Sequence, residues 1–459
     1  MKGRIFTSIF TISILLSCNN KQSKMTSAEV ENLVAEAYVQ TFPIVENYKG
    51  IYFYGVLEQS PKYVPMNSLK NEAVLYSPED KFVVSANNDT YYSTGILDLR
   101  AEPVIFKVPE SKDRYYTFQL VGMTTDNFGY IGVNTTGSEA GIYAVTSPNF
   151  NGTLPEGVKE IKSPSEFVVV AGRTAVNAED PNDSEKAISL QQQYEIGPIH
   201  KFYPDFKVST VNPIDFPALR PTDVDNEEFF SRLNFLMQYN KFTEDEQIII
   251  DSYQKIGIKA GEPYRFFSDN PEYQQAIIAG IKKGHAKVDS IANNMGRNVN
   301  GWDLTSTGKY FGKNYTLRTG WAKRAIYVNS PSEAYYPSVS VDENGAQLNG
   351  ANSYTITFPA DNLPPAKYFW SLTMYHNDTK LMVENDLKRY SIGDRTNGLL
   401  YNKDGTLTLY FSHIEPKEGK SNWLPAPEGD FYLLMRLYGP SNKVLDNQWT
   451  PPSIKKMGK

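Results

Sequence analysis

Polar side chains are concentrated in one short stretch of the sequence, residues 85–93, which reads SANNDTYYS. Asn and Asp side chains accept hydrogen bonds from backbone N–H groups one or two residues further on, so residues 87–90 predict an Asx-type turn that leads into a strand near Tyr91. The same side chains could contact a ligand, because binding sites often lie on loops at the mouth of a β-sheet domain. Both interpretations stand. They make Asn87, Asn88 and Tyr92 candidate ligand contacts, and Asp89 and Tyr91 candidate catalytic residues.

Two arginines and one histidine could also do chemistry. Arg114 precedes a strand-like run and could form a bidentate ion pair with Asp89 or Asp126, or bind an anionic ligand. Arg436 lies inside a strand-like run, where a buried guanidinium needs a partner. His376 has a carboxylate two residues further on, and the two would form an acid–base pair if both lined a cleft. One hypothesis is therefore a hydrolase or lyase that needs no cofactor, with Asp89 or Asp126 as base. Tyr91 and Arg114 would assist it.

Large aromatic side chains form a further group of candidates. Trp370, Tyr375 and Trp423 could stack against a sugar ring, although aromatic residues in strands are more often part of the core. The remaining candidate ligand contacts are Tyr116, Asn127, Asn385 and Arg389. The sequence has no G-x-S-x-G nucleophile motif, no phosphate-binding loop and no closely spaced histidines. We therefore predict neither a metal nor a cofactor.

The N-terminus is typical of an exported lipoprotein. Lys2 and Arg4 precede an apolar run, residues 5–16, that is too short to span a bilayer as a mature helix. The run ends in Leu-Leu-Ser-Cys, which resembles a lipobox, and Cys18 is the single cysteine of the chain. We expect lipidation at Cys18, palmitate included, and attachment to a membrane of the cell envelope, with the body facing the periplasm or exterior.

Composition narrows the class of protein. The chain has 459 residues and a formal net charge of −6 with no long basic run, which argues against a nucleic-acid partner. Aromatic residues make up 13% of the chain, led by 31 Tyr, which favours β-sheet, where aromatic side chains pack well. The length allows two or three domains.

The hydrophobic pattern changes along the chain. A helical pattern begins after a predicted N-cap at Ser27, and Pro43 is expected to interrupt it. Alternating patterns predict strands at 91–99, 103–108, 115–122 and 167–170. A helical stretch follows at about 226–294, with a capping box that begins at Thr243. Strands return from about 300, with a hairpin turn at Asp404-Gly405 and a clear strand at 431–438.

Several sequence blocks resemble two families. The N-terminal blocks are residues 87–93, 114–116, 126–128 and Gly132, and the C-terminal blocks are residues 369–375, 385, 389–391, 422–427, 436–438 and 449–452. The N-terminal blocks resemble domain-of-unknown-function family 1254, and the C-terminal blocks resemble family 1214. This resemblance implies two jelly-roll-like β-sandwich domains joined by helices, as in proteins that are mostly bacterial and often exported. It implies no activity.

The expected fold is mainly β with α, with two β-sandwich, jelly-roll-like domains joined by a helical segment, plus an N-terminal helix. The expected divisions are a signal peptide (1–17), a lipidated Cys and polar tether (18–27), an N-terminal helix and first sandwich (28–220), a helical segment (221–298) and a second sandwich (299–459). The leading hypothesis is a membrane-anchored protein that binds a polar small molecule or glycan. The alternatives are the hydrolase or lyase and a structural or assembly protein of the envelope.

Overall fold

The computed structural model describes residues 24–81, 84–177, 179–220, 224–305 and 313–458. The predicted lipidation residue, Cys18, lies outside these ranges. Within them, no helix combines the length and apolarity needed to cross a bilayer.

The first helix, α1 (Ser27–Ile51), has Thr26 as its N-cap rather than the expected Ser27, and a reciprocal capping box between Thr26 and Glu29 stabilises this start. The prediction that Pro43 interrupts the helix is wrong, because α1 continues through it. A proline has no N–H, so the carbonyl of Val39, four residues earlier, loses its usual donor. The hydroxyl of Thr319 donates to that carbonyl at 2.8 Å, which removes much of the cost of a proline at this position.

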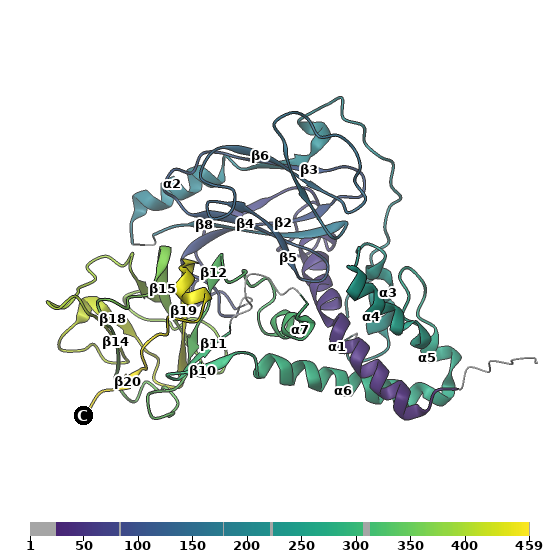
Figure 1. The fold of residues 1–459 in the computed structure, drawn as a ribbon. Coiled ribbons are helices and arrows are strands. Elements are labelled where there is room, and N and C mark those ends of the chain that lie inside the picture. The colour runs from purple at the N-terminus through teal and green to yellow at the C-terminus, as the bar shows by residue number, and fades with distance from the viewer. Residues whose placement is uncertain (1–23, 82–83, 178, 221–223, 306–312, 459) are drawn as a thin grey trace, which may run out of the picture.

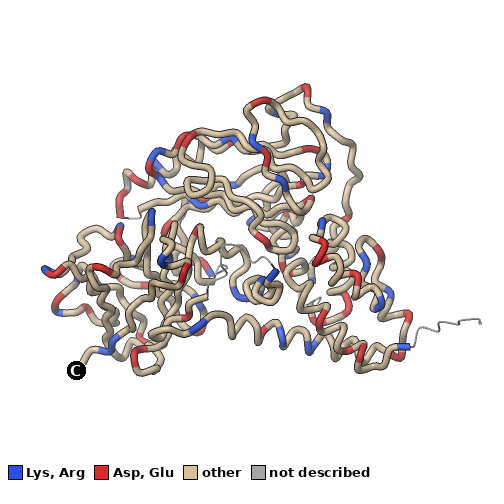
Figure 2. The backbone as a smooth tube through the Cα atoms, viewed as in Figure 1, with Lys and Arg blue, Asp and Glu red and all other residues tan. Residues whose placement is uncertain are grey.

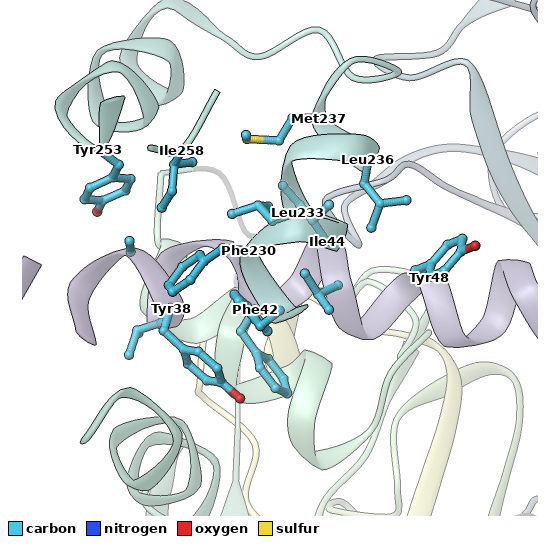
Figure 3. Packing of buried hydrophobic residues seen from close by; sticks show 14 of the residues in the cluster. Tyr38, Phe42, Ile44, Tyr48, Phe230, Leu233, Leu236, Met237, Tyr253 and Ile258 are labelled. Carbon is cyan, nitrogen blue, oxygen red and sulfur yellow. The ribbon is translucent and has the colours of Figure 1, made fainter. Parts of the chain in front are cut away.

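Helices from the middle of the chain pack against α1, which lies beside α6 in Figure 1. Tyr38, Phe42 and Phe230 belong to the apolar cluster that joins these helices (Figure 3). The expected capping box at Thr243 is confirmed. The other α-helices of the described residues are α2 (Pro181–Gln191), α3 (Glu228–Met237), α4 (Glu244–Ser252), α5 (Phe266–Asp269), α6 (Gln274–Asn293), α7 (Tyr315–Arg324) and α8 (Asn442–Leu445).

Two sheets lie in the N-terminal half, and their side chains share one apolar cluster that includes Leu97, Phe106 and Phe118. One sheet has the order β1-β2-β8-β4-β5 and the other β7-β6-β3-β9. Their strands are β1 (Lys70–Glu72), β2 (Thr90–Asp98), β3 (Val104–Val108), β4 (Tyr116–Val121), β5 (Asn127–Gly132), β6 (Gly141–Thr146), β7 (Lys159–Lys162), β8 (Phe167–Ala175) and β9 (Glu195–Pro198).

Two further sheets lie in the C-terminal part, around a second cluster that includes Trp302, Phe358 and Leu433. One sheet has the order β10-β11-β13-β19-β15-β16, with β12 paired to β19, and the other has the order β18-β17-β14-β20. Their strands are β10 (Arg297–Val299), β11 (Trp302–Leu304), β12 (Ala334–Tyr335), β13 (Ser338–Val339), β14 (Tyr354–Phe358), β15 (Ala366–His376), β16 (Ser391–Gly393), β17 (Leu407–Ser412), β18 (Trp423–Pro425), β19 (Phe431–Pro440) and β20 (Lys455–Lys456).

The fold is thus mixed α and β, with several largely antiparallel sheets and a helical layer. The strands expected at 91–99, 103–108, 115–122 and 431–438 are confirmed, apart from shifts of one or two residues at their ends. The strand expected at 167–170 is also present, but it continues to Ala175. Helices α2 and α7 were not expected from the sequence. Basic residues (Lys and Arg) and acidic residues (Asp and Glu) are interspersed along the backbone (Figure 2).

Candidate functional site

The predicted turn at residues 87–90 is confirmed. The side-chain oxygen of Asn87 accepts hydrogen bonds from the backbone N–H groups of Asp89 at 2.7 Å and Thr90 at 3.0 Å. Its amide nitrogen donates to the hydroxyls of Thr90 at 2.9 Å and Tyr92 at 2.8 Å. All the polar atoms of this side chain are therefore used to build the turn, and Asn87 holds its neighbours in place at the start of β2.

The residues around this turn also contact the C-terminal sheet. The backbone carbonyl of Ser85 accepts a hydrogen bond from Arg436 at 2.7 Å, and its hydroxyl lies 2.6 Å from that of Tyr432. The carbonyl of Ala86 accepts from the hydroxyl of Tyr375. Residues 85–89, which we call the 85–89 segment, therefore connect the N-terminal sheet to strands β15 and β19.

Asp89 is the acidic residue of this segment, and only 4% of its surface is exposed. Its Oδ2 accepts hydrogen bonds from Ser371 Oγ at 2.7 Å and from the Tyr438 hydroxyl at 3.4 Å. Arg395 lies 3.9 Å from Oδ1. Burial, and then the charge of Asp89, raise the pKa of the Tyr438 phenol well above its ordinary value, so this hydroxyl stays protonated as a donor.

Asp89 faces a small polar cavity of about 60 Å³ between the two halves of the protein. On one side of the cavity, the 85–89 segment and the residues just before α2 supply amide and carboxylate groups. On the other side, strands β15 and β16 and the loop at 388–396 supply hydroxyls, cations and aromatic rings. The lining residues are Asn88, Asp89, Val176, Asn177, Glu179, Trp370, Ser371, Lys388, Arg389, Tyr390, Ser391, Gly393, Arg395 and Thr396. We call this the junction cavity.

Two arginines of the junction cavity are held in different ways. The guanidinium of Arg395 lies 3.5 Å above the centre of the Phe369 ring. Its NH2 donates to the backbone carbonyl of Asp89 at 3.3 Å. Arg389 NH1 instead donates to the carbonyls of Ser421 at 3.1 Å and Trp423 at 3.2 Å, so Arg389 fixes the loop that forms one wall.

Arg436 does not face this cavity. It is buried, and it donates to Thr373 Oγ1 at 2.8 Å and to the Tyr375 hydroxyl at 2.8 Å, besides the carbonyl of Ser85. Neutral oxygens therefore satisfy its guanidinium. Arg436 and Tyr375 position the 85–89 segment, and we assign neither a direct ligand contact.

Arg114, Asp126 and His376 do not meet Asp89 in one cavity. Arg114 pairs with Asp183 of α2, at 3.0 Å from NH1 to Oδ2, rather than with either expected carboxylate. Asp126 pairs with the buried Arg318 at 2.5 Å. His376 ends β15 and is absent from the lining of the junction cavity.

The other sequence candidates divide into lining and supporting residues. Asn88, Asp89, Trp370 and Arg389 line the junction cavity. The remaining ones make contacts elsewhere in the described structure: Tyr91 in a small apolar cluster, Tyr92 with Asn87, Tyr116 in the N-terminal core, Asn127 with the Val328 carbonyl, Asn385 with the Arg389 carbonyl and Trp423 with the Ser412 carbonyl.

Sequence reasoning did not select Ser371, Ser391, Lys388 or Arg395. Ser371 and Ser391 lie inside blocks that carried the family resemblance, so those blocks were the available signal. Arg395 follows a strand of only three residues and has no distinguishing local pattern.

A larger cavity, of about 370 Å³, lies among α3, α4 and the loop that follows. Two of its amides are used within the protein, since Gln247 and Gln254 both donate to Asp251, at 2.8 and 2.9 Å, whereas the buried amide oxygen of Asn240 has no hydrogen-bond partner among the described residues. Only residues 237–262 line it, whereas the junction cavity joins both halves of the chain. In the described ranges, no three His, Cys, Asp or Glu side chains are arranged to hold a metal ion.

Comparison with known families finds a match in the N-terminal part of the chain and another in the C-terminal part. Residues 66–198 match the family described as protein of unknown function DUF1254, and residues 333–442 match protein of unknown function DUF1214. The chain therefore belongs to the proteins that combine these two families in this order. The 85–89 segment lies in the first matched region, and Ser371, Ser391 and Arg395 lie in the second. The junction cavity is thus formed by both.

The fold is supported by a solved structure. The chain is 26% identical to the VPA0106 protein from Vibrio parahaemolyticus, whose crystal structure aligns with a TM-score of 0.74 over 94% of this chain and 100% of that chain. The crystal structure of an uncharacterized protein from Burkholderia cenocepacia is more distant, with 10% identity and a TM-score of 0.44 over 94% of this chain and 93% of that chain. No curated protein matches the sequence.

Proposed function

We propose that the protein binds a small polar molecule, or the end of a glycan, in the junction cavity. The observation that carries the proposal is the buried pair of Asp89 and Ser371, which come from the two matched regions and meet at 2.7 Å in the wall of a polar cavity. Binding sites commonly lie between domains, where a few polar groups converge. Ser371 and Ser391 donate their hydroxyl protons to Asp89 and Asn88, so their oxygens can still accept hydrogen bonds from the hydroxyl groups of a ligand.

The size of the cavity limits what enters it. A volume of about 60 Å³ is enough for a few water molecules or one polar functional group, but not for a whole hexose. The rest of the ligand would lie at the mouth. Tyr390 and Trp370 are the aromatic residues of the lining, and an aromatic face at that place suits a sugar ring.

Calorimetric titration with a panel of envelope monosaccharides and oligosaccharides tests this function. Ser391→Phe should fill the cavity and abolish the heat of any ligand found. Ser353→Phe adds the same side chain at an exposed serine outside the lining and should leave binding unchanged. Equal loss in both variants, or undiminished binding in Ser391→Phe, would assign the ligand to another place.

The proposed architecture is a pair of jelly-roll-like β-sandwiches joined by the helical layer. The apolar cluster shared by each pair of sheets supports it. The proposed location is the cell envelope, with a lipid on Cys18, and it is supported by the lipobox-like sequence alone. Incorporation of labelled palmitate into the wild type but not into Cys18→Ser tests the anchor, and a wild-type protein without label would overturn it.

A hydrolase or lyase is the second candidate function, and the surroundings of Asp89 favour it. A carboxylate within 2.7 Å of a serine hydroxyl could act as a base, with Tyr438 and Arg395 as its neighbours. These neighbours replace Tyr91 and Arg114 of the sequence hypothesis. Turnover of a bound ligand should then fall by at least about a hundredfold in Asp89→Asn. Unchanged turnover in that variant would exclude Asp89 as the base.

A further inference from the structure

We propose that the ligand of the junction cavity carries a carboxylate, which binds the guanidinium of Arg395, and that Lys388, another cation of the same lining, adds to the attraction. The inference depends on the proposed function, because it names the chemical class of the ligand at the same site. It follows from three features of the cavity: the free donors of Arg395, the state of the carboxylates already present, and the volume.

Arg395 has donors available in the plane of its guanidinium. One face of the group is covered by Phe369, at 3.5 Å, so an incoming group can approach only along the edge or from the open face. NH2 makes a long bond of 3.3 Å to the Asp89 carbonyl. Among the described residues, Nε and NH1 have no hydrogen-bond acceptor. NH2 keeps a second N–H, which lies parallel to the N–H of either Nε or NH1, so one fork of two parallel donors remains for the two oxygens of a carboxylate.

The carboxylates in the lining do not occupy these donors. Asp89 Oδ2 accepts from Ser371, and its Oδ1 remains 3.9 Å from Arg395, beyond hydrogen-bond distance. Glu179 Oε2 accepts from the backbone N–H of Asn397 at 2.7 Å. Both acids therefore already have partners on the protein.

The cations of the lining exceed the acids. The lining contains three cations, Lys388, Arg389 and Arg395, and two acids, Asp89 and Glu179, so its formal net charge is +1. Lys388 forms no ion pair within the described part of the chain. A cavity with an unbalanced cation and free N–H donors favours an anionic group over a neutral hydroxyl.

The volume fits the same conclusion. A carboxylate is small enough for a cavity of about 60 Å³, and a sugar acid would keep its ring outside, against Tyr390. A phosphate offers similar oxygens and is the alternative source of the same chemistry, which the experiment must separate.

Titration calorimetry with glucuronate, glucose and glucose 1-phosphate tests whether the ligand carries a carboxylate. Charge-assisted hydrogen bonds are stronger than neutral ones, so the wild type should bind glucuronate about ten- to a hundredfold more tightly than glucose. Arg395→Gln should remove this preference, and Arg395→Lys should restore part of it. Arg297→Gln, an exposed arginine outside the lining, is the matched control and should behave as the wild type. Thermal melting of each variant checks that it is folded.

The outcomes separate the two proposals. Equal binding of glucose and glucuronate, or a preference that survives in a folded Arg395→Gln, would overturn the carboxylate while the junction cavity remains a binding site. Tighter binding of glucose 1-phosphate than of glucuronate would replace the carboxylate by a phosphate. No binding of any of the three, with another ligand from the panel bound in the cavity, would overturn the carboxylate alone. No binding of anything would overturn both proposals.

Discussion

Replacing Asp89 by alanine should destabilise the whole protein, because its carboxylate connects the two matched regions. The change leaves the hydroxyls of Ser371 and Tyr438 as buried donors without their acceptor. Each unsatisfied buried donor costs about 1–3 kcal/mol, and the contact with the partly exposed Arg395, at 3.9 Å, adds little. Because the Tyr438 bond is long, at 3.4 Å, we expect Asp89→Ala to lower the free energy of unfolding by about 2–4 kcal/mol.

Urea unfolding followed by tryptophan fluorescence measures this loss. Asp89→Asn keeps an oxygen for Ser371 and loses the charge, so it should cost about 1–2 kcal/mol. Asp361→Ala removes an exposed aspartate and should change stability by less than about 0.5 kcal/mol.

A double-mutant cycle isolates the contact itself. Asp89→Ala and Ser371→Ala should be coupled by about 1–2 kcal/mol, because the two side chains share one hydrogen bond. A loss of less than about 1 kcal/mol in Asp89→Ala, or additive effects of the two changes, would refute the reasoning.

Three further changes test other parts of the fold. Thr319→Val should cost about 1–3 kcal/mol by leaving the Val39 carbonyl unpaired, and adding Pro43→Ala should recover part of it; equal losses with and without Pro43→Ala would contradict this. Gly280→Ala should lower the melting temperature although alanine favours helices, because its Cβ would lie 2.7 Å from the backbone of α1; a higher melting temperature would be evidence against close packing. Burial raises the pKa of Glu333 above its ordinary value of 4.5, so ionisation of this carboxyl lowers the free energy of unfolding as the pH rises from 4.5. The free energy of unfolding of Glu333→Gln, relative to that of the wild type, should therefore increase as the pH rises from 4.5. A difference that does not depend on pH would disprove this.

Local patterns were enough to find the turn at Asn87 and most of the strands. An Asx turn depends on residues within three positions of each other, and a strand shows its alternation directly, so both can be read from short windows. The course of α1 could not be found in this way. Pro43 is tolerated because Thr319, 276 residues later in the chain, donates to Val39, and no local pattern records that contact.

Local patterns also predicted part of the candidate site, and the residues whose partners lie far away in the sequence were missed. Asn88 and Asp89 stood out because polar residues were dense there, and they do line the junction cavity. Arg114 was matched to the wrong acids, since the partner Asp183 belongs to α2, a helix whose pattern went unnoticed. Arg395 was missed because its position depends on stacking with Phe369, which tertiary structure alone brings together.

The most direct test of the central claim is a crystal structure of the protein grown with a ligand that calorimetry has identified. Our account predicts electron density for a polar group in the junction cavity, within hydrogen-bond distance of Asn88, Ser391 or Arg395. Ligand density confined to the larger cavity among α3 and α4, with the junction cavity holding water only, would contradict it.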